Sequence, residues 1–285
     1  MPELPEVEVV TQSLIKRIKN CKINSVKVYN RSLRYKVPFQ FEKYLKNKII
    51  KNIRRKSKYI IFEFNYNNYL ILHLGMSGTL HIPQMKSGIS NLSFYQSPQI
   101  PIKHNHVIFN FVKYKLIYND PRRFGYFKIL KNKQEFDMYF TRIGPEALDR
   151  KFNLNYLLNK INNRKKNIKN FLLDQKIVSG IGNIYVNEIL FKSKILPSKS
   201  VRKLSILDLK KILKFSRSVL RYAIRQGGSS IKDFKGLSGN NGKFQTRFKV
   251  YNRDKKYCLS RNCNGVIKKI YISNRSTFLC NLCQN

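Results

Sequence analysis

Four of the five cysteines lie in the last 28 residues of the chain, at spacings that suit a metal ion. Cys258 and Cys263 have four residues between them, Cys280 and Cys283 have two, and sixteen residues separate the pairs. Two such knuckles joined by a β-hairpin place four thiolates tetrahedrally around zinc. Four protein ligands leave no open position for a substrate, so we predict one structural Zn²⁺ ion. Cys21 stands apart and is interpreted as an ordinary core or surface thiol.

The amino terminus offers a different chemistry. Glu3, Glu6 and Glu8 are three of only 15 acidic residues in the chain. Carboxylates favour a helix N-terminus, which accounts for Glu6 and Glu8, whereas Glu3 is expected to lie before the helix, free to point elsewhere. If Met1 is removed, Pro2 becomes a secondary amine, whose neutral form can attack a carbonyl-like carbon and form a Schiff base. The neighbouring Glu3 carboxylate could then move protons.

Two strand ends resemble active-site loops. The segment from His73 to Gly78 ends an apolar run in a glycine-flanked turn that exposes Met76. The segment from Asp120 to Gly125 combines Arg122 with Phe124. Apolar side chains beside arginine are the composition that proteins insert between stacked bases. Ordinary core packing is the alternative for both apolar residues.

Two further positions could hold a phosphate. Gly180-Ile181-Gly182-Asn183 could bring backbone N–H groups and Asn183 to a phosphate at a helix start, although the same pattern suits a helix–helix turn. Arg275 is expected on the return strand of the zinc hairpin, where its paired N–H groups can contact phosphate. A solvated surface arginine is the alternative there.

The charge of the chain favours a polyanionic partner. Its 57 Lys and Arg against 15 Asp and Glu give a formal charge of +42. An acidic substrate, a nucleic acid and an anionic membrane are the natural candidates, and we favour nucleic acid. AT-rich coding could inflate the lysine count but does not explain the scarcity of acids. No run approaches the ~18–20 apolar residues of a membrane span, and the acidic start is unlike a signal peptide, so we expect an intracellular protein.

The elements that must carry these residues change character along the chain. Val7, Val10, Leu14 and Ile18 recur at helical spacing, and strand-like runs follow as far as about residue 130. Helical spacing returns after Phe152. Four runs are β-rich, at residues 58–64, 69–74, 106–111 and 115–118. Residues 204–225 have the pattern of one long helix, and residues 258–283 carry the four cysteines. We predict an α+β, two-domain protein: an N-terminal antiparallel β-sandwich with an N-terminal helix, then a helical domain with a zinc-finger β-hairpin.

These segments together closely resemble the formamidopyrimidine-DNA glycosylase family. The ordered match runs from residue 2 to residue 284, and although each motif is modest, their ordered set is highly specific. The matching motifs are Met1 to Glu8, Lys58-Tyr59, His73 to Gly78, Asp120 to Gly125, Gly182 to Tyr185, Gln226-Gly227-Gly228 and the terminal zinc finger.

The resemblance implies a bifunctional DNA repair enzyme that is both glycosylase and abasic-site lyase. Its substrates would be oxidised purines, such as 8-oxoguanine and formamidopyrimidines, and abasic sites in double-stranded DNA. Pro2 would attack the sugar C1′ and form the Schiff base, and Glu3 would be the general acid/base. Lys58 matches the family's active-site lysine. β- and δ-elimination would then cleave the strand, with a part for Arg275 in the second step.

The resemblance also implies how the DNA is held. Met76, Arg122 and Phe124 would fill the space left by the flipped nucleotide, and Arg122 would contact the orphaned cytosine. The positions that match DNA-contacting residues are His104, Arg164, Asn183 and Arg275. We expect a monomer, because the sequence shows no obvious oligomerisation seam, and a location in the cytoplasm of a bacterium, at the nucleoid. The implied organisation is a catalytic β-sandwich (2–131), a hinge (132–150), a helix-two-turn-helix domain (151–228), a mobile lesion-recognition loop (229–245) and the zinc finger (246–285).

The sequence departs from the common family pattern at three points. The first zinc knuckle has four intervening residues rather than two, which still permits tetrahedral geometry. Leu279 stands where an aromatic residue is usual, and Arg164 stands where lysine is frequent, so that this contact could differ in geometry. None of these changes removes a catalytic group.

Three other interpretations compete with this one. The endonuclease-VIII branch of the same superfamily prefers oxidised pyrimidines, but Leu4 and the set Met76, Arg122 and Phe124 favour the purine branch. A non-catalytic DNA- or RNA-binding protein would use the zinc module and the charge alone, without a free Pro2. A decaying, inactive enzyme is the third, against which the intact Pro2, Glu3, Lys58 and four zinc-module cysteines argue.

Overall fold

The computed structural model describes residues 1–83, 101–162, 164–229 and 244–285. The chain forms two compact units, one of Met1–Phe140 with Gln226–Gln245 and one of Thr141–Arg225 with Thr246–Asn285. The predicted lesion-recognition loop lies largely outside the described residues, because only positions 229, 244 and 245 of it belong to them. The finer division of the chain stays a prediction.

The first unit begins with the predicted amino-terminal helix, α1 (Leu4–Ile18). Pro5 occupies its first turn, where a missing N–H costs no hydrogen bond. The four apolar residues that predicted this helix are all buried, which confirms the prediction. They face a core shared with the strands.

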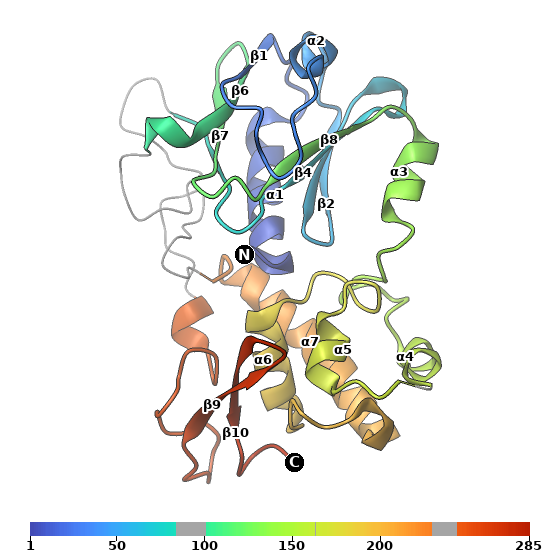
Figure 1. Ribbon diagram of the computed structural model, residues 1–285, viewed down its shortest axis with the longest axis vertical. Helices are drawn as coiled ribbons and strands as arrows, with labels where there is room; N and C mark the ends of the chain where they lie inside the picture. Colours follow the sequence, from blue (N-terminus) through green and yellow to red (C-terminus); the bar gives the residue numbers. More distant parts are fainter. Residues whose placement is uncertain (84–100, 163, 230–243) are drawn as a thin grey trace. The chain divides into compact units, whose positions relative to one another are not determined.

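Two antiparallel four-stranded sheets make up the sandwich in the described part of this unit (Figure 1). The first has the order β1 (Ser25–Val28), β6 (Asn105–Asn110), β7 (Lys115–Asn119) and β5 (Thr79–His81). The second has the order β2 (Asn52–Lys56), β3 (Tyr59–Glu63), β4 (Tyr69–His73) and β8 (Tyr126–Leu130). Both expected strand pairs form, β3 with β4 and β6 with β7, so the predicted sandwich is confirmed.

Apolar side chains of both sheets and of α1 belong to one core. Aromatic rings join the sheets: the Phe109 and Tyr118 rings of the first sheet lie 5.9 and 5.0 Å from the Phe127 ring of the second. The unit also contains the short helices α2 (Phe41–Leu45) and α3 (Lys133–Phe140) and the 3₁₀ turns Asn65–Asn67 and Ile102–His104.

The second unit is helical and ends in a hairpin. Its helices are α4 (Leu154–Ile161), α5 (Ile168–Leu173), α6 (Asn183–Ser193) and α7 (Ile206–Arg225), with the 3₁₀ turn Val201–Lys203. The predicted long helix is thus α7. Helix α6 is buried on nearly all sides and contacts α5, α7 and β10.

The hairpin consists of β9 (Ile267–Ile272) and β10 (Arg275–Cys280), which lie beside α6 in Figure 1. The 3₁₀ turn Phe244–Arg247 precedes it. Among the described residues, no helix has both the length and the apolar character needed to cross a membrane.

Candidate active site and metal centre

The amino terminus lies at the start of α1, where Pro2 and Glu3 are both buried. Glu3 is the N-cap residue and forms a capping box with Glu6, whose Oε2 accepts the Glu3 backbone N–H at 2.9 Å. The prediction that Glu3 precedes the helix is confirmed. The expectation that its side chain points elsewhere is wrong, because the side chain also takes part in the capping box.

The terminal amino group belongs to Met1, directly before Pro2, and its surroundings lower its pKa. Burial is the largest cause, the carboxylates of Glu3 and Glu6 oppose it, and the cations of Lys58 and Arg122 add to it. A lower pKa leaves more of an amine neutral near pH 7, and the neutral form is the nucleophile. The structure therefore brings the predicted catalytic residues Glu3 and Lys58, together with Arg122, to the amino terminus.

Lys58 is presented by a two-residue turn between β2 and β3 and is only 6% exposed. Ser57 adopts a left-handed conformation there (φ 56°), which is uncommon for a residue other than glycine. Arg55 holds this turn: its Nη1 donates to the Ser57 carbonyl at 2.9 Å, and its Nε donates to Glu8 Oε2 at 2.7 Å. Glu8 thereby ties α1 to the turn that carries Lys58.

Sequence reasoning missed this link. It assigned Glu8 to helix electrostatics alone and gave Arg55 no role. The two residues are 47 positions apart, and no local motif marks such a pair.

Met76 and Phe124 lie on adjacent turns and are 46% and 41% exposed, so the core-packing alternative is wrong for both. The Arg122 guanidinium carbon lies 4.7 Å from the centroid of the Phe124 ring. Gly75 permits the close approach of the two turns: it has φ 67°, and a Cβ there would come within 2.4 Å of the Gly125 nitrogen. The two apolar residues and the arginine thus belong to one surface.

The fully buried Asp120 carboxylate organises this surface. Its Oδ2 accepts hydrogen bonds from the Tyr118 hydroxyl at 2.9 Å and the Gly125 N–H at 2.8 Å. Its Oδ1 accepts from the Ser77 hydroxyl at 2.5 Å and, at 3.3 Å, from the Arg122 N–H. One carboxylate therefore fixes both turns.

The main chain of Asp120 also binds His104, which the sequence predicted to contact DNA. The Asp120 N–H donates to the His104 carbonyl at 3.0 Å, and the ring Nε2 of His106 lies 2.8 Å from the Asp120 carbonyl oxygen. Sequence reasoning quoted Asp120 within a motif but assigned it no role. The donors that reach its carboxylate become apparent only when β5 and β7 are paired, because Ser77 lies just before β5.

Glu6 connects α1 to the Gln226-Gly227-Gly228 motif. Its Oε1 accepts the Ser229 N–H at 2.8 Å and the Ser229 hydroxyl at 2.9 Å. Gly228 has φ 78°, and a Cβ there would meet the same Oε1 at 3.1 Å. The glycine motif is thus held against the start of α1.

In the second unit, Asn183 is the first residue of α6 after its N-cap Gly182, as the helix-start interpretation expected. Asn183 Nδ2 donates to the Ser276 carbonyl at 3.0 Å. The fully buried Lys169, which the sequence did not single out, donates from Nζ to the same carbonyl at 3.0 Å and to the Thr277 hydroxyl at 2.7 Å. The backbone directly after Arg275 is therefore fixed from two helices.

Arg275 is the first residue of β10 and is exposed, on the return strand as predicted. The two-residue turn before it has φ 49° at Ser273 and 57° at Asn274, the signature of a type I′ hairpin. Arg164 follows α4, and in the part of the chain that the structure describes no hydrogen bond joins it to Asn183 or Arg275.

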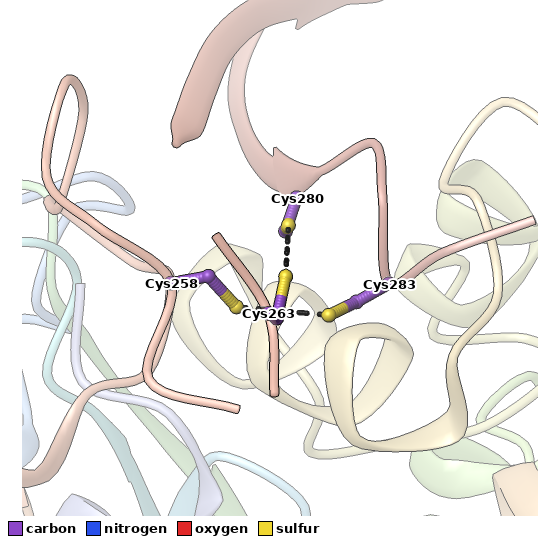
Figure 2. A group of neighbouring side chains, drawn as sticks. All are labelled: Cys258, Cys263, Cys280 and Cys283. Carbon is purple, nitrogen blue, oxygen red and sulfur yellow. Dashed lines mark hydrogen bonds between the residues drawn. The ribbon is translucent and has the colours of Figure 1, made fainter. Parts of the chain in front are cut away.

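The four cysteines of the hairpin module converge on one point (Figure 2). All four sulfur atoms lie within 4.8 Å of one another, and the pairs Cys258–Cys283 and Cys263–Cys280 are each 3.7 Å apart. A disulfide would need about 2.0 Å. Four thiolates at about 2.3 Å from a tetrahedral zinc ion would be about 3.8 Å apart, so the spacing fits the metal.

The backbone around the sulfurs suits the same purpose. The N–H groups of Ser260 and Gly265 each lie 3.4 Å from a knuckle sulfur, those of Cys258 and Cys263 respectively. A Cβ at Gly265 would stand 2.7 Å from Cys280 Sγ, so only glycine leaves the cluster its room. The four-residue first knuckle therefore still closes the site, and all four ligands belong to the protein.

Comparisons with known proteins follow these features along the whole chain. The sequence model of the formamidopyrimidine-DNA glycosylase N-terminal domain matches residues 1–127, and that of the formamidopyrimidine-DNA glycosylase H2TH domain matches residues 143–235. Proteins called formamidopyrimidine-DNA glycosylase from Wolbachia pipientis subsp. Culex pipiens and from Roseobacter denitrificans are 41% and 38% identical, each covering both chains completely.

Solved structures agree with the sequence relatives. A complex of a Lactococcus lactis Fpg variant with DNA containing Fapy-dG superposes with a TM-score of 0.88 at 34% identity, over 100% of each chain. A complex of the same bacterium's Fpg with DNA containing an abasic site has a TM-score of 0.86 at 34% identity, over 99% of each chain.

Proposed function

The chain belongs to the formamidopyrimidine-DNA glycosylase family, a family of DNA repair enzymes that act on damaged bases, and we propose that it excises oxidised purines from duplex DNA through a Schiff base on Pro2. The observation that carries the proposal is the environment of the amino terminus. The amino group of Met1, directly before Pro2, has a lowered pKa beside the capped start of α1, and the Glu3 carboxylate and the Lys58 cation both act on it.

The proposed chemistry begins once Met1 is removed and Pro2 carries the amine. The Pro2 nitrogen forms a bond to the sugar C1′ while the bond from C1′ to the damaged base breaks, and the departing base takes the electron pair and a proton. The sugar ring then opens at C1′–O4′ to give an iminium ion, with Glu3 supplying the proton to O4′. Lys58 stabilises the anionic groups nearby and takes part in proton transfer.

Strand cleavage follows from the iminium ion. Loss of a proton from C2′ expels the 3′ phosphate, and a second elimination, with loss of a proton from C4′, expels the 5′ phosphate. Hydrolysis of the remaining adduct frees Pro2. Arg275 contributes by holding a phosphate during the second elimination, for which its fixed place at the start of β10 is suited.

The remaining predicted residues are proposed to hold the DNA. Met76, Arg122 and Phe124 enter the space left by the flipped nucleotide, which offsets part of the few kcal/mol lost on unstacking. His104, Arg164 and Asn183 bind the DNA backbone. One zinc ion on the four cysteines keeps the hairpin folded and takes no part in the chemistry.

Borohydride trapping tests this proposal on two duplexes, one with 8-oxoguanine opposite cytosine and one with thymine glycol. We expect a covalent complex on the 8-oxoguanine duplex. It should be weakened in Pro2→Gly and kept in the matched control Pro5→Ala, which alters the other proline of this segment. Mass spectrometry of the protein establishes removal of Met1 in each case.

Two outcomes would contradict it. A crosslink on thymine glycol alone would assign the enzyme to pyrimidine damage. No crosslink on either duplex, with Met1 removed and DNA still bound, would exclude the Schiff base.

A further inference from the structure

A row of rings begins beside Lys58, on the face of the second sheet that points away from the core. Tyr59 lies opposite His73 on β4, and His73 lies opposite Tyr126 on β8. Residues directly opposite each other in antiparallel strands share a face, and the adjacent Ile60 belongs to the core on the other face. The His73 ring lies 5.0 Å from the Tyr59 ring and 5.4 Å from the Tyr126 ring, centroid to centroid. The residue next to Lys58 is therefore part of a continuous layer of rings.

Helix α3 packs its last two side chains against this layer. The rings of Tyr139 and Phe140 lie 6.1 and 5.5 Å from the Tyr59 ring, each at an interplanar angle of 80°. Edge-to-face contact of this kind is a favoured arrangement of aromatic pairs. Phe140 is buried, so its contact with Tyr59 is shielded from water. Tyr59 is thus in contact with both β4 and α3.

Three tyrosine hydroxyls connect the same elements. The hydroxyl oxygens of Tyr126 and Tyr139 lie 2.9 Å apart, and Tyr126 is also hydrogen-bonded to the Tyr59 side chain. Burial raises the pKa of Tyr59, and the hydrogen bond with Tyr126 adds to the effect. Burial likewise raises the pKa of Tyr126, and that of Tyr139 to about 12. All three hydroxyls therefore keep their protons at neutral pH and remain available as hydrogen-bond donors.

The other end of the turn contacts the same helix. Lys56 pairs with Tyr59 across the turn that carries Lys58. Its Nζ lies 4.6 Å from the centroid of the Phe140 ring and 5.5 Å from that of Phe136, within the range of a cation–π contact. Both residues that flank the turn therefore contact α3.

We propose that Tyr139 and Phe140 position Lys58 for base excision. They hold Tyr59 and Lys56, the residues at the two ends of its turn. The proposal rests on the proposed function, in which Lys58 acts at the terminal amine. A lysine side chain has a flexible four-carbon stem, so the place of its ammonium group depends on how firmly the backbone of the turn is held. Tyr139 and Phe140 have no part in bond breaking and act only through the turn.

Single-turnover excision of 8-oxoguanine from duplex DNA measures this positioning. Tyr139→Phe removes only the hydroxyl, and we expect a rate about three- to tenfold below wild type, well short of the ~100-fold that a 1 Å misplacement can cost. Phe140→Leu removes the ring from both Tyr59 and Lys56, so its loss of rate should be at least as large. Both variants should bind a duplex that contains a tetrahydrofuran abasic analogue as tightly as wild type, because neither change alters a residue that holds the DNA.

A double-mutant cycle with Lys58→Gln separates positioning from a general structural role. Lys58→Gln keeps the terminal amine and Glu3 and should excise slowly. If Tyr139→Phe acts through Lys58, it should change that slow rate by less than about twofold, because the group that it positions is already gone. The proposal is overturned if the double variant shows the full product of the two losses, or if either α3 variant excises at the wild-type rate.

Matched controls lose the same groups elsewhere in the sandwich. Tyr44→Phe removes a hydroxyl that donates to the Asn68 side chain. Phe64→Leu removes a buried ring whose centroid lies 6.0 Å from a lysine ammonium, at the opposite end of β3 from Lys58. Both controls should excise at the wild-type rate. Thermal unfolding of all four variants shows whether a loss of rate comes from a loss of fold.

Failure of the proposed function would be visible separately, because hydrogen exchange measures the turn without any chemistry. Residues 56–59 should exchange faster in Tyr139→Phe and Phe140→Leu, and at the wild-type rate in both controls. A wild-type protein that neither excises 8-oxoguanine nor forms the borohydride crosslink would contradict the proposed function, while faster exchange would still support the positioning of the turn. Unchanged exchange in both α3 variants of an active enzyme would overturn the positioning alone.

Discussion

The metal centre and the amino-terminal site are assembled in opposite ways. The four cysteines lie within 26 residues and meet through one hairpin and two knuckles. The amino-terminal site draws on α1, the turn before β3 and the turn after β7, so its residues meet only when both sheets have formed. Spacing in the sequence therefore encodes the first site almost completely, whereas the second depends on contacts distant in sequence.

This difference predicts different failures. Loss of one cysteine should unfold a local module, because that module has little core of its own. Loss of a residue at the amino-terminal site should leave the fold intact, because a large apolar core holds the sandwich together. Chemistry, and not folding, should fail there.

Metal removal should produce the largest effect. Structural zinc sites in small modules contribute about 10–16 kcal/mol of apparent binding energy, so the apo hairpin should unfold and DNA affinity should collapse. Hydrogen exchange should show β9 and β10 losing protection while β3 and β4 keep theirs. Cys280→Ser should behave like the metal-free protein. Cys21→Ser is the control and should keep one zinc ion per chain, as measured by metal analysis. A Cys280→Ser protein that retained one zinc and bound DNA normally would contradict a four-cysteine site.

Glu3→Gln should come next, through chemistry alone. Removing a general acid/base costs about 10²- to 10⁴-fold in rate, so single-turnover excision of 8-oxoguanine should fall by that factor. Zinc content and the affinity for the abasic analogue should stay near wild type. Glu42→Gln, a carboxylate of the same sandwich that pairs with Arg31, is the matched control and should keep the rate. Equal losses of rate and of thermal stability in Glu3→Gln would instead indicate that the residue only caps α1.

The sequence predicted much of this fold, and the reasons are local. Apolar spacing marked α1 and α7, and alternating β-rich runs marked β3, β4, β6 and β7. The cysteine spacing predicted the cluster that the structure contains. Each of these signals lies within one element or one hairpin.

The buried polar links could not be predicted in this way. Arg55 reaches Glu8, Lys169 reaches Thr277, and the Asp120 carboxylate collects donors from two turns. Partners 47 or 108 residues apart share no periodicity, and their types are common on surfaces. The sequence also left core packing open as an alternative for Met76 and Phe124, because apolar residues after a strand are usually core.

Asp120→Asn should sharpen the comparison within the first unit. An amide has one acceptor oxygen where the carboxylate offers two. If the amide nitrogen replaces Oδ2, the Gly125 N–H and the Tyr118 hydroxyl lose their acceptor, and if it replaces Oδ1, the Ser77 hydroxyl does. Each buried group left without an acceptor should cost about 1–3 kcal/mol of stability. We expect excision from paired duplexes to fall more than trapping on an abasic site in single-stranded DNA, which needs no insertion between bases. Equal losses on both substrates would assign Asp120 to overall folding.

Acid should weaken the first unit through its histidines. All four histidines lie there, and burial lowers the pKa of His73 to about 4, with the Lys58 and Arg34 cations adding to the effect. Its Nδ1 accepts the Gly75 N–H at 3.1 Å, which protonation would prevent. A folded pKa below the unfolded value of 6.5 means that stability is present above pH 6.5 and is lost as pH falls toward 4, by about 1.4 kcal/mol per pH unit.

Urea unfolding at pH 7 and pH 5 measures this loss of stability, and hydrogen exchange at the two pH values shows whether β4 is affected. His73→Gln should reduce the pH dependence and leave the part contributed by His81, whose pKa burial lowers to about 3. The same dependence in His73→Gln as in wild type would show that His73 is not the group responsible.

The Glu8–Arg55 pair should give the smallest effect and the finest test of how Lys58 is placed. The pair is partly buried, with side chains 20% and 8% exposed, so we expect a coupling energy of about 1 kcal/mol in a double-mutant cycle of Glu8→Gln and Arg55→Gln. Because Arg55 also holds the Ser57 carbonyl, its loss should loosen the turn and lower the excision rate a few-fold with little change in DNA affinity. Arg55→Lys should recover the charge but not both hydrogen bonds, so it should restore the rate only in part. Full recovery in Arg55→Lys would mean that the positive charge alone positions Lys58 and that the two Arg55 hydrogen bonds are not required.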